Sequence, residues 1–167
     1  VLEKVYARDF EVFADRVAAA GPMRALDAVF ESIRIAADLY RSDPAFYRGL
    51  SIGNPRSERE LVSAVQGPRR AFWLALLGRA IEEGDLAAET RLDLLSVAMM
   101  QLGGGAFGAW VADLISLDEM ERQTSYGLAR LLLGVAGPAA RLALQARIDA
   151  LEAACVPQPQ PTPAAAS

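Results

Sequence analysis

The chain has 167 residues, of which 53% are hydrophobic and 23% charged, enough for one domain with a hydrophobic core. Its 17 basic and 21 acidic residues give a net charge of -4, which excludes a strongly basic surface for nucleic acid. The lack of histidine excludes His-based metal sites and Ser-His or Cys-His catalytic pairs, and the single Cys155 excludes an internal disulfide.

Apolar residues recur at spacings of three and four along most of the chain, and this spacing predicts helices. Gly21-Pro22 ends the first helix and places Pro22 at the first position of the second, while Gly67-Pro68 breaks or kinks the fourth. Gly84 is the expected C-cap of the fourth helix, and Ser116 starts a capping box. The expected helices cover about 2–20, 22–40, 44–50, 57–83, 88–113, 116–136 and 138–154.

β-branched residues never cluster, so no strand is expected. The predicted fold is therefore all-α, a bundle of about six or seven helices in one domain over residues 1–155. Residues 156–167 form a Pro/Ala-rich tail outside that domain.

The stretch MMQLGGGAFGAW, residues 99–110, allows three interpretations. Gly103, Gly105 and Gly108 match the dinucleotide motif G-x-G-x-x-G, but no strand precedes them and no acidic residue follows about 20 positions later. The run 94–112 carries no charge, which also fits a membrane helix, although its four glycines lower its hydrophobicity.

The favoured interpretation is a helix covered by its own bundle and by a second copy of the chain. The helices around 92–110 and 117–135 both carry long apolar stripes with small residues, so this last long pair can form a four-helix interface with a symmetry mate. The glycines then serve close packing or a kink, or else they loosen a turn beside a ligand cavity.

Four segments resemble the C-terminal regulatory domain of the tetracycline-repressor (TetR) family of transcriptional regulators: 5–10 (VYARDF), 80–86 (AIEEGDL), 110–119 (WVADLISLDE) and 126–134 (YGLARLLLG). The resemblance implies a cytoplasmic homodimer that senses a small hydrophobic or amphipathic effector and needs no catalysis, cofactor, metal or membrane. It also implies an N-terminal helix-turn-helix domain ahead of residue 1 that binds the DNA.

The resemblance and the apolar spacing together select candidate residues. Aromatic and apolar side chains suited to an effector pocket are Phe10, Phe13, Phe30, Ile33, Tyr40, Phe72, Trp73, Leu76, Met99 and Phe107. Candidate dimer contacts are Leu95, Leu102, Gly104, Ala106, Gly108, Trp110, Met120, Thr124, Gly127, Leu128, Leu131 and Val135. Arg69 and Arg70 are expected on a solvated helix face.

Two other classes of function stay open at this stage. One is a small all-α enzyme with an apolar pocket, which without histidine would depend on Asp, Glu, Arg or Tyr. The other is a helical adaptor whose apolar faces pair with a different protein.

Overall fold

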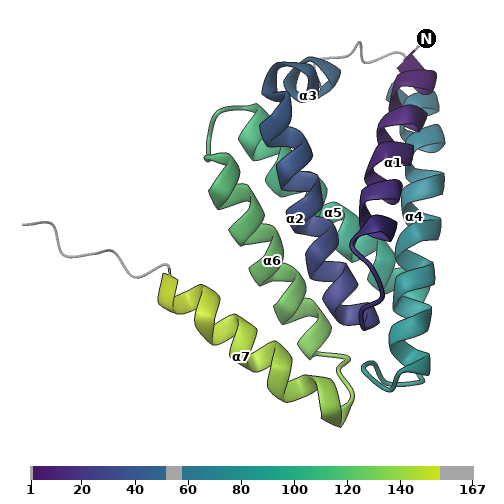
Figure 1. The fold of residues 1–167 in the computed structure, drawn as a ribbon, viewed down its shortest axis with the longest axis vertical. Coiled ribbons are helices and arrows are strands. Elements are labelled where there is room, and N and C mark those ends of the chain that lie inside the picture. The colour runs from purple at the N-terminus through teal and green to yellow at the C-terminus, as the bar shows by residue number, and fades with distance from the viewer. Residues whose placement is uncertain (1, 52–57, 155–167) are drawn as a thin grey trace, which may run out of the picture.

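The computed structural model describes residues 2–51 and 58–154 (Figure 1). The expected tail 156–167 lies outside them. The described residues form seven helices and no strand, which confirms the all-α prediction; one isolated bridge joins Leu86 and Ala136. The helices are α1 (Leu2–Ala19), α2 (Ala25–Ser42), α3 (Pro44–Ser51), α4 (Glu58–Glu82), α5 (Leu92–Val111), α6 (Leu117–Leu133) and α7 (Pro138–Ala154).

Helix α2 is the centre of the bundle. It packs against α1, α4 and α6, while α5 lies behind it against α4 and α6, and α7 runs along α6 (Figure 1). The larger core joins α2, α4, α6 and α7 through fully buried side chains such as Val29, Leu77, Leu132 and Ile148. A smaller core around Trp110 joins the end of α5 to α2, α3 and α6.

The second helix begins at Ala25, three residues later than Pro22, where its start was predicted. The backbone N–H of Ala25, the first residue of α2, donates a hydrogen bond to the Glu83 carboxylate at 2.8 Å. The preceding Arg24 guanidinium donates to the buried Asp85 carboxylate. The cap is thus supplied by the end of α4 and not by a neighbouring residue. A local sequence signal cannot reveal such a partner.

Replacing Glu83 with Gln is expected to lower stability at neutral pH by roughly 0.5–1 kcal/mol. The hydrogen bond from the Ala25 N–H, with help from Arg79, holds the pKa of Glu83 below its usual 4.5. A lowered carboxylate pKa stabilises the fold above the unfolded-state pKa, and this contribution disappears as the pH falls through the folded-state value.

Urea unfolding of both proteins between pH 3 and pH 7 measures this difference, which should be constant above about pH 5 and shrink in more acidic solution. Glu82→Gln changes an exposed neighbour that takes no part in the cap, and it is the matched control. A difference between Glu83→Gln and the parent chain that does not change with pH would contradict the ionic cap.

Helix α4 continues through Gly67 and Pro68, so the alternative of a break at this point is wrong. A proline inside a helix removes one backbone hydrogen bond and crowds the preceding turn. Downstream of Pro68, α4 buries Leu76, Leu77 and Ala80 in the core. We attribute the continuity of α4 to this packing.

Helix α5 is helical from Leu92 to Val111. The glycines therefore form no phosphate-binding loop, and the dinucleotide interpretation is excluded because a helix stands where its strand and loop would be. By length and composition α5 could cross a membrane, with a mean hydropathy of 1.4 and 22% of that window buried. It is the one such helix among the described residues. A core helix of a soluble protein passes the same test when it is mostly buried, whereas most of this window of α5 is not buried within the chain.

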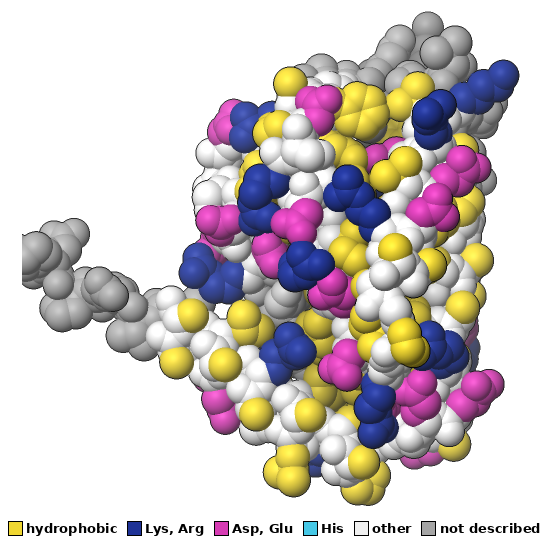
Figure 2. Space-filling model, in the orientation of Figure 1, with side chains coloured by type: hydrophobic (Ala, Val, Ile, Leu, Met, Phe, Trp, Pro, Cys, Tyr) yellow, Lys and Arg dark blue, Asp and Glu magenta, His cyan; other side chains and the backbone are white. Residues whose placement is uncertain are grey.

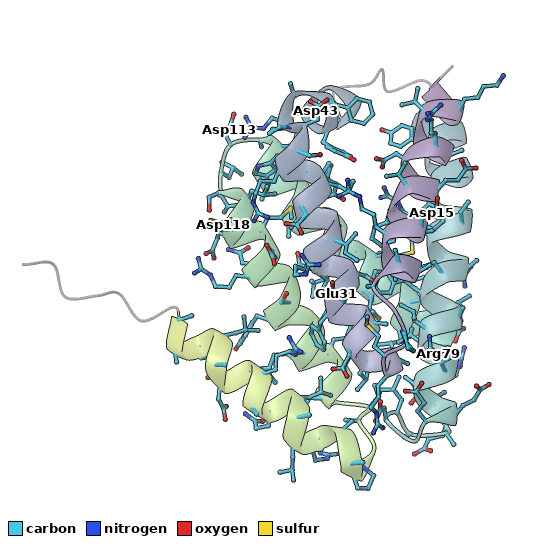
Figure 3. The ribbon with its side chains drawn as sticks, in the orientation of Figure 1. Asp15, Glu31, Asp43, Arg79, Asp113 and Asp118 are labelled. Atoms are coloured by element: carbon cyan, nitrogen blue, oxygen red, sulfur yellow. The ribbon has the colours of Figure 1, made fainter. Side chains whose placement is uncertain are left out.

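The turn between α5 and α6 is anchored from two sides (Figure 3). Asp113 pairs with Arg48 of α3 at 2.7 Å, and Asp118 accepts a hydrogen bond from Arg41 of α2 at 2.8 Å. The predicted cap of α6 is confirmed, since the Ser116 hydroxyl accepts a hydrogen bond from the Glu119 N–H at 3.1 Å. Figure 2 shows that acidic and basic side chains intermingle over the face formed by α2 and α6.

Candidate functional site

A cavity of about 190 Å³ lies between α1, α2, α4, α5 and α6. Eight of the ten predicted pocket residues line it: Phe10, Phe13, Ile33, Tyr40, Phe72, Trp73, Met99 and Phe107. They come from four helices, α1, α2, α4 and α5. The helical spacing predicted them correctly because each lies on the inward face of its helix. The structure also brings Gly103 and Gly104 of α5 to the same cavity.

Phe30 and Leu76 lie elsewhere, both buried in the larger core. The Phe30 ring packs under α7, with the Arg147 guanidinium 4.0 Å from its centroid. Both residues satisfy the same helical spacing as the lining residues, so spacing alone cannot separate core from cavity.

The cavity wall contains two aromatic groups. On one side Phe72 meets Phe13 edge-to-face at 5.3 Å and Phe10 at 6.2 Å. On the other side Tyr40 stacks on Trp110 at 5.7 Å and contacts Phe107 at 4.9 Å. Edge-to-face and offset contacts of this kind fix ring orientation, so they form a rigid apolar lining for a flat ligand.

Two charged residues complete the lining, and the sequence interpretation missed both. Asp9 of α1 and Arg69 of α4 face the cavity with side chains 11% and 40% exposed. Arg70 is exposed as predicted, whereas Arg69 belongs partly to the cavity. A signal was available, because Asp9 precedes Phe13 by four residues and Arg69 precedes Phe72 by three, which puts each on the face of a lining aromatic.

Asp9 is held in place by α3. The Tyr47 hydroxyl donates to Asp9 Oδ1 at 2.6 Å, and burial with this bond raises the pKa of Tyr47. Burial also raises the pKa of Tyr40, whose ring lies 4.7 Å from that of Tyr47. The cavity is therefore lined by one neutral tyrosine, Tyr40, one carboxylate and one guanidinium, while Tyr47 holds the carboxylate from outside the lining. It can combine apolar contact with a few directed hydrogen bonds.

The predicted dimer residues divide into three groups. Leu95, Trp110, Met120, Thr124 and Leu128 are buried within the chain, and Met120, Thr124 and Leu128 reach the cavity. The half-buried group is Leu102, Ala106, Gly127, Leu131 and Val135. Gly104 and Gly108 are exposed. Since a residue buried in its own chain has little surface for a partner, exposure limits any direct contact to the second and third groups.

The outer face of α5 is apolar and uncovered. Leu94 and Val97 are 61% and 40% exposed, and Gln101, Gly104, Gly105 and Gly108 continue the same face. A methyl group built at Gly104, Gly105 or Gly108 meets none of the described atoms within 4 Å. The glycines thus do not serve close packing inside the chain.

These features can be compared with those of other proteins. No family model, curated protein or solved structure matches this chain.

Proposed function

We propose that the chain is the small-molecule-sensing, homodimerising regulatory domain of a TetR-like transcriptional regulator in the cytoplasm. One observation carries the proposal: the cavity and the uncovered apolar surface lie on the same helix, α5. Gly103 and Phe107 of α5 line the cavity, and Gly105 and Gly108 face outward. A ligand that moves α5 therefore acts directly on the proposed dimer contact.

The outer face of α5 suits a second copy of the chain. It carries no charge from Leu94 to Ala112, and its glycines let two helix backbones approach closely. Exposed apolar patches on soluble proteins commonly mark interaction sites. In the proposed dimer, Leu94 and Val97 supply apolar area while Gly104 and Gly108 set the distance between the helices.

Helix α1 supplies the connection to DNA in this proposal. It follows the expected helix-turn-helix domain, and its Phe10 and Phe13 line the cavity. For the ligand to regulate DNA binding, it must bind one arrangement of the two DNA-reading domains more tightly than the other. Contacts to α1 provide that difference, since the ligand touches the element nearest the DNA-binding domains.

Light scattering of the 167-residue chain at micromolar concentration tests the dimer, with an expected mass of twice 17.9 kDa. A screen of small apolar and amphipathic compounds by thermal shift tests the sensor, because a ligand that binds the folded state raises its melting temperature. A monomer in the first experiment would contradict the homodimer. No stabilising compound in the second would contradict the sensor.

A further inference from the structure

The charged pair at the cavity is incomplete. Arg69 Nη2 lies 3.9 Å from Asp9 Oδ2, too far for a hydrogen bond. Asp9 already accepts the Tyr47 hydroxyl on its other oxygen. The Arg69 guanidinium makes no hydrogen bond to the described residues, although it carries five N–H donors. The pair therefore has mainly hydrogen-bond donors left to offer a ligand.

Two further donors on the cavity wall are unused. The Tyr40 hydroxyl and the Trp73 indole form no hydrogen bond within the described part of the chain, and both residues line the cavity. Both donors share the wall with the Arg69 guanidinium, and a site that offers these donors together with a cationic one favours an acceptor that carries negative charge.

The size and lining of the cavity restrict the rest of the ligand. A cavity of about 150 Å³ accommodates benzene, so about 190 Å³ holds one ring with a short substituent, or two fused rings. The edge-to-face cluster of Phe10, Phe13 and Phe72 extends naturally to one more aromatic ring.

We propose that the cavity binds a small aromatic carboxylate of one or two rings. Its ring lies among Phe13, Phe72 and Phe107, and its carboxylate pairs with the Arg69 guanidinium, whose planar fork matches two carboxylate oxygens. The Tyr40 hydroxyl donates to the same group. This inference rests on the proposed ligand-sensing function and names the class of its ligand.

Three compounds that differ only in their terminal group test the charge: phenylacetate, 2-phenylethanol and phenethylamine. Calorimetric titration of each into the 167-residue chain is expected to show phenylacetate binding at least about tenfold more tightly than the alcohol, with the amine weakest. Equal affinity for all three compounds would overturn the proposal. Tightest binding of the amine would also overturn it and would identify Asp9 as the recognition group.

Two substitutions should shift phenylacetate binding in opposite directions. Arg69→Gln removes the guanidinium and is expected to weaken phenylacetate by roughly tenfold or more while leaving 2-phenylethanol unchanged. Asp9→Asn removes the nearby negative charge, keeps an acceptor for Tyr47, and is expected to tighten phenylacetate severalfold. If Arg69 and Asp9 only stabilised the fold, both substitutions would change phenylacetate affinity in the same direction. They would then change the affinity for 2-phenylethanol as well.

Arg70→Gln is the matched control, because Arg70 is the exposed neighbour of Arg69 on the same helix. Equal loss of phenylacetate binding in both Arg variants would overturn the assignment.

Failure of this inference can be told apart from failure of the proposed function. If no phenyl compound binds while other compounds in the screen do, the aromatic-acid class falls and the sensor stands; if no compound binds, both fall.

Discussion

Replacing Gly137 with Ala is expected to lower the free energy of unfolding by about 3 kcal/mol. Gly137 is buried where the link between α6 and α7 crosses the link between α4 and α5. Its N–H donates to the Asp85 carbonyl at 2.8 Å, and the Ala87 N–H donates to the Val135 carbonyl at 2.9 Å. A methyl group at position 137 would overlap the Gly84 carbonyl oxygen, which is backbone and cannot rotate away.

Thermal unfolding of the purified chain measures this effect, and a loss of about 3 kcal/mol corresponds to a fall of about 10 °C in the melting temperature. Gly78→Ala is the control, because a methyl group there meets no described atom within 4 Å inside α4. That change is expected to stabilise the chain by about 0.5–1 kcal/mol through helix propensity. A Gly137→Ala variant that melts with the parent chain would show that the two links can separate at little cost.

The crossing at Gly137 also illustrates which features the sequence could predict. The sequence places a stop and a start at Gly137-Pro138, and α7 indeed spans Pro138–Ala154 as expected. The contact with Gly84 joins two turns that are distant in the chain, and no local pattern encodes it. The late start of α2 has the same cause, since its cap is Glu83.

The cavity shows the same division between local and distant information. Helical spacing was enough to bring Phe13, Phe72 and Phe107 to one place, because each spacing reports the inward face of a single helix. It could not separate the lining residues from Phe30, which depends on where α7 packs. The spacing to Phe13 does put Asp9 on the cavity face, but its hydrogen bond to Tyr47 on another helix has no local signal.

Leucine at Gly104 or Gly108 is expected to convert the proposed dimer into a monomer, raising its dissociation constant by roughly a hundredfold or more. Inside the chain a methyl group at either position meets no described atom within 4 Å, so the exposed side chain should not disturb the bundle. Gly→Leu inside a helix should even add helix propensity, by about 1 kcal/mol. For Gly108 the loss is therefore expected in association alone. Gly104 also lines the cavity, so a leucine there is expected to occupy part of the ligand site as well.

Light scattering measures the mass of each variant, and far-ultraviolet circular dichroism checks that its helix content is unchanged. Gly49→Leu on α3 is the matched control, since Gly49 is equally exposed with open space around it and lies away from the outer face of α5. It should remain a dimer. Gly104→Leu and Gly108→Leu variants that also remain dimeric would place the interface elsewhere, and the cavity and the dimer contact would then no longer share α5, the feature on which the proposed coupling depends.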